Sequence, residues 1–190
     1  MAFAYYNIST TDKTTISAVD TIADTLALQG PPKSMTICNS TVVANTCAVD
    51  LYIVSQFGTD IRDTGTDANE IDNYATSSSV TLTVDGTGAT DSIFKNEKVW
   101  KSDGTLFGTC TSVTNTTTLV FSGGIEQTLA NNDSLYTGSK YYILRDAYIP
   151  ARHTLVLEES ELNYDSTIYS LVFVLRDVSS SQIIDIKVKY

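Results

Sequence analysis

Apolar and polar side chains alternate along short stretches of this chain, and the densest such stretch begins at Tyr141. In the run 141–146, with sequence YYILRD, Tyr141 and Ile143 fall on one face of an extended strand and Tyr142 and Leu144 on the other. Because both faces carry large apolar side chains, this pattern predicts a strand that is partly covered on both sides.

A second strand is predicted directly after the first. Pro150 ends the first run, because proline has no N–H for a sheet ladder and disfavours helix at the preceding residue. The run 153–157 is again apolar and β-branched. Two such runs joined by a short proline turn indicate a hairpin of a β-sandwich or barrel rather than a βαβ unit.

Three other stretches alternate in the same way, at 33–39, 49–54 and 184–190. With period-two patterns in these stretches and no long helical pattern, we expect an all-β fold. The prediction is an antiparallel β-sandwich of the jelly-roll or immunoglobulin-like type, built from residues 33–76 and 139–190.

The segment 58–79 is acidic and glycine-punctuated and ends in a run of serines, so we expect a loop and a domain boundary there. Its carboxylates suggest a calcium site, since hard cations take several oxygen ligands. They are Asp60, Asp63, Asp67, Glu70 and Asp72. Their spacing fits no EF-hand loop and Arg62 lies among them, which favours a solvated acidic loop.

Residues 77–138 are interpreted as a separate, inserted β-barrel-like module. Asp103 and Gly104 stand between two strand-like runs and predict a hairpin with a type I′ turn, and 122–124 predicts a second turn. Trp100 is expected in the core, with exposure as a platform for stacking sugars as the alternative. The predicted core is Val84, Phe94, Val99, Trp100, Phe107, Val113, Leu119, Phe121 and Leu135.

The segment 1–32 has no clear period and is interpreted as an extended N-terminal arm. Its aromatic and apolar anchors can pack on its own domain or reach a neighbouring subunit by strand addition, and both alternatives stay open. The candidate interface residues are Phe3, Tyr5, Tyr6 and Ile8 from this segment, together with Trp100 and His153.

The net charge and the hydropathy of the chain argue against two classes of partner, nucleic acid and membrane. The net charge of −10 and the pI of about 4.3 oppose binding to a phosphate backbone, which requires clustered Lys and Arg. The apolar runs are all strand-sized, and 1–10 lacks a basic start followed by an apolar block. We therefore expect a soluble chain that binds neither nucleic acid nor membrane and has no signal peptide.

Catalytic chemistry is not indicated. The chain has one histidine, His153, which lies beside Arg152, and no GxSxG sequence surrounds a serine. Glu158, Glu159 and Glu161 could flank a glycosidic bond, but adjacent acids of this kind are ordinarily solvated. We expect no enzyme activity, no cofactor and no metal.

Three cysteines, Cys38, Cys47 and Cys110, cannot all pair within one chain, and none is spaced as CxxC. Free, buried thiols are therefore expected. A bridge between Cys38 and Cys47 on neighbouring strands stays a second possibility.

The segments KSMTICN, VDLYI, YYILRDAYIP and TLVLEE, in this order, resemble small β-sandwich virion structural proteins of tailed bacteriophages, particularly marine and cyanobacterial phages. The inserted runs VWKSDGTLFGTCTSV, TTTLVFSGG and NDSLYTG are similar to small β modules of phage particle proteins. The resemblance covers 33–190 and rests on pattern rather than on a diagnostic motif.

This resemblance implies a non-enzymatic structural protein, a capsid decoration or neck-associated subunit that assembles in the host bacterial cytoplasm and resides in the virion. Its partners would be the major capsid protein, portal, neck or tail proteins, and copies of itself as an oligomer. The alternative is a carbohydrate-binding or host-recognition module of a tail or fibre assembly. Its stacking candidates are Trp100, Tyr136 and Tyr74.

Overall fold

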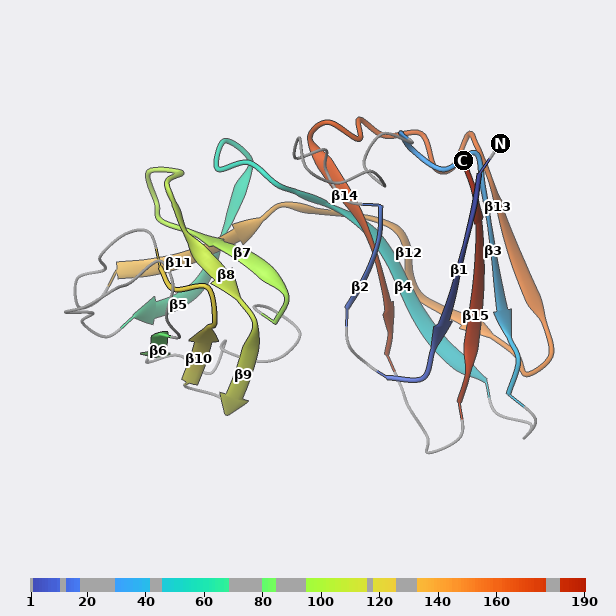
Figure 1. The fold of residues 1–190 in the computed structure, drawn as a ribbon, viewed down its shortest axis with the longest axis horizontal. Helices are drawn as coiled ribbons and strands as arrows, with labels where there is room; N and C mark the ends of the chain where they lie inside the picture. The colour runs from blue at the N-terminus through green and yellow to red at the C-terminus, as the bar shows by residue number, and fades with distance from the viewer. Residues whose placement is uncertain are drawn as a thin grey trace. The chain divides into compact units, whose positions relative to one another are not determined.

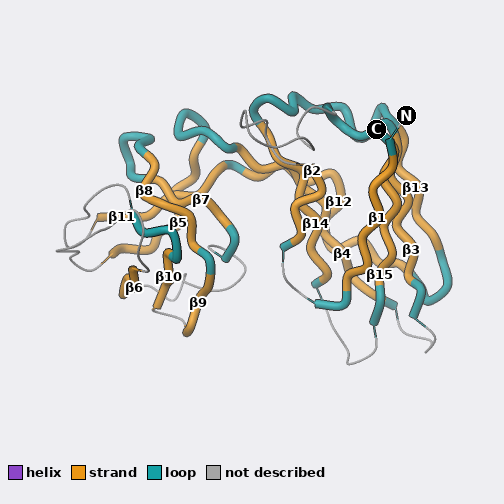
Figure 2. The backbone as a smooth tube through the Cα atoms, viewed as in Figure 1, coloured by secondary structure: helices purple, strands orange, loops and turns teal. Residues whose placement is uncertain are grey.

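A computed structural model of the protein describes residues 2–10, 13–17, 30–41, 46–68, 80–84, 95–115, 118–125, 133–176 and 182–190. Fifteen β-strands lie in these ranges, and no described segment is helical (Figures 1 and 2). The expected all-β fold class is confirmed. The strands are β1 (Phe3–Ile8), β2 (Thr14–Ser17), β3 (Ser34–Asn39), β4 (Cys47–Ser55), β5 (Ile61–Ala68), β6 (Val80–Thr83), β7 (Glu97–Trp100), β8 (Leu106–Cys110), β9 (Ser112–Asn115), β10 (Thr118–Phe121), β11 (Asp133–Gly138), β12 (Lys140–Ile149), β13 (Thr154–Glu158), β14 (Tyr169–Leu175) and β15 (Ile184–Lys189).

The chain divides into two compact units. The first combines Met1–Val54 with Lys140–Tyr190, and the second is Ser55–Ser139. The second unit therefore begins earlier than the predicted insert at 77–138. The reason is that part of the supposed acidic loop, Ile61–Ala68, forms strand β5, which pairs with β11 inside the second unit.

The first unit is a sandwich of two four-stranded sheets. Sheet A has the strand order β1-β15-β3-β13, and sheet B has the order β12-β4-β14-β2. Successive strands of this unit change sheet at every connection but one, so that the chain winds around a common core (Figure 1). The exception is β4 to β12, two neighbours in sheet B between which the second unit is inserted. This wiring is that of a jelly roll.

The predicted hairpin across Pro150 is wrong. β12 pairs with β4 in sheet B, whereas β13 pairs with β3 in sheet A. The turn between them is a corner that carries the chain from one sheet to the other, and Arg152 adopts a positive φ of 64° there. Both strands were correctly located, but the local pattern could not indicate which sheet each one joins.

The core of the first unit lies between the two sheets. On β15 the alternation follows the prediction, with Ile184, Ile186 and Val188 buried and Asp185 exposed between them. The fully or nearly fully buried residues of this core are Ile8, Ile16, Met35, Ile37, Cys47, Val49, Leu51, Ile149, Leu157, Leu162, Leu171, Phe173, Leu175, Ile184, Ile186 and Val188.

The N-terminal segment is not a free arm, which corrects that interpretation for its described part. β1 pairs with β15 at the edge of sheet A, and β2 pairs with β14 at the edge of sheet B. Each strand contributes one buried isoleucine to the core, Ile8 and Ile16. Of the two alternatives, packing on its own domain is the one observed.

Two tyrosines near the ends of the chain form hydrogen bonds to strand β2. The hydroxyls of Tyr6 and Tyr190 each donate a hydrogen bond to the Ile16 carbonyl, both at 2.9 Å. Burial raises the pKa of both phenols, and the neighbouring Tyr6 raises the pKa of Tyr190 further. β1, β15 and β2 are thereby tied together at one acceptor.

The second unit contains a four-stranded sheet of order β5-β11-β7-β8 and a three-stranded sheet of order β6-β10-β9. Only Thr111 separates β8 from β9, and its N–H donates to the Val120 carbonyl on β10, so one bent segment passes from the first sheet to the second. Closure into a barrel stays a prediction. The core residues here are Leu82, Val84, Val99, Phe107, Cys110, Leu119, Phe121, Ile125 and Leu135, with Val113 packed against them.

Most of the predicted core of this unit is confirmed, and predicted Phe94 lies outside the described residues. The β7–β8 hairpin is also confirmed. Its turn is not type I′, which requires positive φ at both central residues, because only Gly104 is positive, at 81°, and its N–H bonds to the Lys101 carbonyl. The second turn repeats this arrangement, with Gly124 at 82° bonded to Phe121.

Deleting residues 1–30 is expected to unfold the first unit, because the deletion removes two strands and exposes the core that Ile8 and Ile16 cover. The readout is the thermal transition followed by circular dichroism. Trp100, the single tryptophan, lies in the second unit, so its fluorescence serves as an internal control that should keep its transition. An unchanged cooperative transition of the truncated chain would restore the free-arm interpretation.

The stability of the first unit is expected to fall as the pH rises above about 10, the ordinary pKa of tyrosine. The folded state keeps protons on Tyr6 and Tyr190 that the unfolded chain releases, so this contribution is complete below that pH and is lost above it. Urea unfolding at about pH 8 and about pH 11 measures it. The Tyr6→Phe/Tyr190→Phe variant should show a smaller difference, whereas Tyr148→Phe, at an exposed position, should match the wild type.

Candidate functional site

The outward face of sheet A carries the most distinctive arrangement of side chains in the described residues. The antiparallel register sets these side chains in three rows across the four strands, always in the order β1, β15, β3, β13. The rows are Phe3, Lys189, Ser34 and Glu158; Tyr5, Lys187, Thr36 and Val156; and Asn7, Asp185, Cys38 and Thr154.

Two exposed aromatic rings on β1 hold a lysine from β15. The Lys187 ammonium lies 4.8 Å from the centre of the Phe3 ring and 5.8 Å from that of Tyr5. Phe3 is 46% exposed and Tyr5 is 70% exposed. A cation over two rings is attracted by their negative faces, so Lys187 and the rings hold each other in place.

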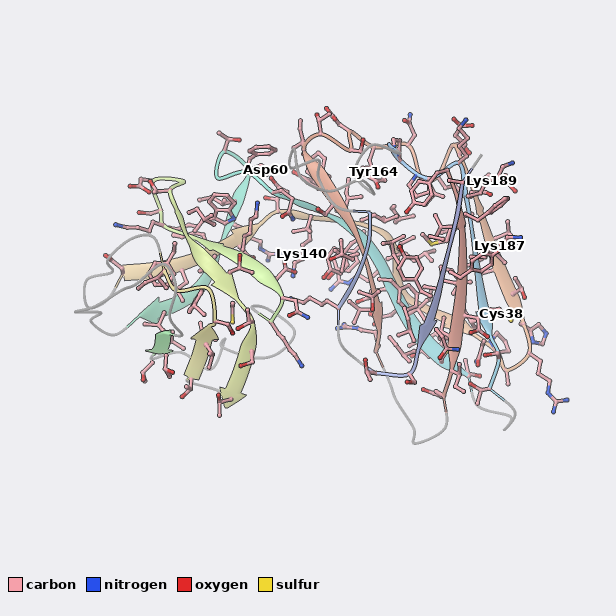
Figure 3. All side chains as sticks on the ribbon, in the orientation of Figure 1. Cys38, Asp60, Lys140, Tyr164, Lys187 and Lys189 are labelled. Atoms are coloured by element: carbon pink, nitrogen blue, oxygen red, sulfur yellow. The ribbon has the colours of Figure 1, made fainter. Side chains whose placement is uncertain are left out.

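The neighbouring acid is already partnered. The Asn7 amide donates to the Asp185 carboxylate at 2.6 Å, which links β1 and β15 in the next row. The three rows thus carry both signs of charge, with Lys187 and Lys189 on β15, Asp185 on the same strand and Glu158 on β13. Figure 3 shows both lysines and Cys38 on the sheet A side of the sandwich.

A groove of about 400 Å³ runs over these rows. It is lined by Tyr5, Tyr6, Asn7, Thr36, Cys38, Asp185, Ile186 and Lys187. Its walls thus offer one exposed ring, an ammonium group, an amide, a hydroxyl, the Asp185 carboxylate and the Cys38 thiol. These groups can bind an extended polar partner, and no histidine lies among them to serve as a base for the thiol.

The edge strands of the sandwich differ in how they are protected from further pairing. On β12 the ladder shifts register twice, and Asp146 adopts a positive φ of 47°. Its N–H donates to the buried Asp50 carboxylate at 2.7 Å, and Arg176 contacts Asp50 at 3.1 Å and Asp146 at 3.3 Å. Burial opposes the charge of Arg176, yet the two carboxylates hold its pKa above the ordinary value. Such a bulged, charged edge resists the addition of another strand.

On β13 one end of the edge is blocked by an acid. The Glu161 carboxylate accepts the Glu158 N–H at 2.8 Å, while the Glu161 N–H donates to the Glu158 carbonyl in a tight turn. This places Glu161, one of the three acids considered for glycoside hydrolysis, in a structural cap at the end of the strand. Glu158 and Glu159 are exposed.

β1, in contrast, is a regular edge. Its ladder with β15 runs through six consecutive pairs without a shift. The Tyr190 N–H donates to the Ala2 carbonyl, and hydrogen-bonded pairs alternate along an antiparallel ladder, so Phe3, Tyr5 and Asn7 direct their backbone N–H and C=O groups away from β15. Within the part of the chain that is described, no other strand pairs with this side.

The structure separates the six predicted interface residues. Phe3 and Tyr5 lie on the exposed face of sheet A, whereas Tyr6 is half-buried and Ile8 is buried on the opposite side of the same strand. Two others lie elsewhere in the fold: Trp100 is only 6% exposed on β7, and His153 is exposed at the corner between β12 and β13.

Burial of Trp100 contradicts its use as a platform for stacking sugars. β7 pairs with β11 at this residue, opposite Tyr136, which is half-buried, and Lys98 lies 6.0 Å from the indole ring. Tyr74, the third stacking candidate, lies outside the described residues. So do Glu70 and Asp72 of the calcium hypothesis, and the side chains of Asp63 and Asp67.

Sequence reasoning missed Lys187 and Val156 as parts of this surface. The period of two in 184–190 does place Lys187 on the outer face. Its position beside Phe3 and Tyr5 follows only from the pairing of the two chain ends, which no local pattern indicates.

The described ranges contain no group of three His, Cys, Asp or Glu side chains arranged to hold a metal, and no helix in them is long and apolar enough to cross a membrane. No family model, curated protein or solved structure matches the chain. The resemblance to phage virion proteins therefore stays a prediction.

The three thiols differ in access, which a titration can measure. All are free in the structure: Cys47 and Cys110 are buried, burial raises the pKa of Cys47, and Cys38 is half-buried in the groove. In the native protein Cys38 should react first with a thiol reagent, and all three should react in denaturant without reductant. Cys38→Ser should abolish the fast phase. Fewer than three reactive thiols in the denatured chain would instead indicate a bridge.

Proposed function

We propose that the protein is a non-enzymatic structural protein of a tailed-phage virion, a capsid decoration or neck-associated subunit that assembles through β-strand contacts. The observation that carries the proposal is the jelly-roll wiring of the first unit combined with the regular, aromatic edge strand β1. Jelly rolls are common in viral capsid proteins. An exposed, regular and aromatic edge is a ready template for pairing with another chain.

The charge and the site chemistry agree with an assembly role. A chain of net charge −10 is repelled by nucleic acid, so its partners in a particle would be proteins. The sheet A face offers apolar rings and lysines for such contacts. Of the acids near it, Asp185 accepts a hydrogen bond from the Asn7 amide, and Glu161 caps the end of β13.

The second candidate is a carbohydrate-binding or host-recognition module of a tail or fibre. The groove beside Tyr5 supports it, because its volume lies within the range of small-ligand sites and jelly rolls also occur in lectins. The position of Lys187 weighs against it, since the ammonium lies over the ring faces on which a sugar would stack.

Particles purified from the source of this sequence provide the test. We expect mass spectrometry to find the chain in stoichiometric amounts in the particles, and electron microscopy with a specific antibody to locate it on the head or neck. The purified chain should bind no member of a glycan array. Absence from the particles would refute the proposal, and glycan binding by the isolated chain would favour the second candidate.

A further inference from the structure

Both edges of sheet A expose an unexplained apolar side chain in the same row. Tyr5 on β1 is 70% exposed and Val156 on β13 is 50% exposed, and the row between them contains Lys187 and Thr36. Large apolar side chains at the middle of an edge strand favour pairing with another strand. The two edges therefore need partners, or need each other.

The backbone of β13 is oriented to accept such a partner. The Asn39 N–H donates to the His153 carbonyl at 3.0 Å, and hydrogen-bonded pairs alternate from there along the ladder with β3. Leu155 therefore faces β3, whereas Thr154, Val156 and Glu158 direct their backbone groups away from β3; of these three, only Glu158 is already bonded there within the described residues, to Glu161. The same three residues carry the outward side chains of β13.

We propose that sheet A continues from one copy of the chain to the next, with β13 of one copy added antiparallel to β1 of its neighbour. Strand directions alternate across the order β1-β15-β3-β13, so an added copy in the same orientation meets β1 with an antiparallel β13. This inference deepens the proposed function, on which it rests, by naming the first partner as a second copy.

One register satisfies the backbone and the side chains together. With Tyr5 opposite Val156, Phe3 falls opposite Glu158 and Asn7 opposite Thr154, and all six residues turn their backbone groups toward the joint. The Glu158 N–H is already bonded to the Glu161 carboxylate, so the ladder of the joint is carried by the Tyr5–Val156 and Asn7–Thr154 pairs. An aromatic residue beside a β-branched one is a favourable cross-strand pair. Glu158 would lie next to the Phe3 ring, over which Lys187 is held, so opposite charges meet across the joint.

Other pairings of the same edges fit less well. A twofold pair of β1 strands would bring two lysine-bearing faces together, and a twofold pair of β13 strands would leave Tyr5 exposed. Only the head-to-tail joint covers Tyr5 and Val156 with each other. A joint of this heterologous kind closes into a ring or continues as a filament, which suits a subunit that repeats around a particle.

Val156→Pro tests the backbone part of the joint. Proline removes an N–H that points away from β3, so the fold should tolerate it at this edge position, while the intermolecular ladder loses a donor. Sedimentation velocity of the full chain over a range of concentrations should show head-to-tail oligomers for the wild type and association at least about tenfold weaker for the variant. Val156→Thr, which keeps the N–H and the branched side chain, is the matched control and should associate like the wild type.

A charge exchange tests the polarity of the joint. Lys187→Glu alone and Glu158→Lys alone should each associate weakly, because like charges then meet. An equimolar mixture should recover oligomers in which the two variants alternate, since both edges of each variant then meet an opposite charge on the other variant. Circular dichroism of both variants checks that they remain folded.

Three results would overturn the joint: a wild type that stays monomeric throughout, a Val156→Pro variant that associates as the wild type does, or a mixture that fails to recover. None of these three results bears on whether the chain is present in purified particles. Failure of the joint is thus distinguishable from failure of the proposed virion role, which the particle analysis decides separately.

Discussion

The jelly roll depends on the last strand of the chain. β15 lies between β1 and β3, so sheet A cannot close until residues 184–189 have paired with both the N-terminal strand and β3. The Tyr190 and Tyr6 hydroxyls then meet at the Ile16 carbonyl, which links this pairing to sheet B. Pairing strands that are this distant in sequence costs a large loop-closure entropy. Folding is therefore expected to be slow and to require the complete first unit.

The same arrangement determines which surfaces remain for assembly. Interior strands of the sandwich have a neighbour on each side, so among its described strands the edges open to a partner are those of β1, β13, β2 and β12. β12 is bulged and charged around Asp146, and β2 is short. Sheet A is left with one regular aromatic edge and one edge capped at a single end by Glu161. These differences make a joint through sheet A more favourable than one through sheet B.

The local pattern predicted strands well where apolar side chains alternate, as in β3 and β15, and where apolar and β-branched residues form a continuous run, as in β4 and β12. It failed for β1, whose inward side chains include the polar hydroxyl of Tyr6, and for β5, whose strand is rich in acids. It also could not distinguish a hairpin from a corner at Pro150. The exposed pair Phe3 and Tyr5 was predicted as interface, but the lysine between them was not, because its position depends on the pairing of residues more than 180 positions apart.

The insertion enters the chain between two paired strands of sheet B and interrupts no ladder of sheet A. Val54 and Lys140 are paired neighbours in sheet B, and the inserted unit begins and ends next to each other, with the Ser55 N–H bonded to the Ser139 carbonyl. The fold of the second unit also depends on contacts within that unit. One of them brings Gly58 against the Gly104 backbone so closely that a Cβ added at Gly58 would overlap the Gly104 carbonyl. A unit with its own core and closely spaced ends can vary in sequence without altering the register of β1 or β13. The proposed assembly through sheet A and any function of the insert can therefore evolve independently.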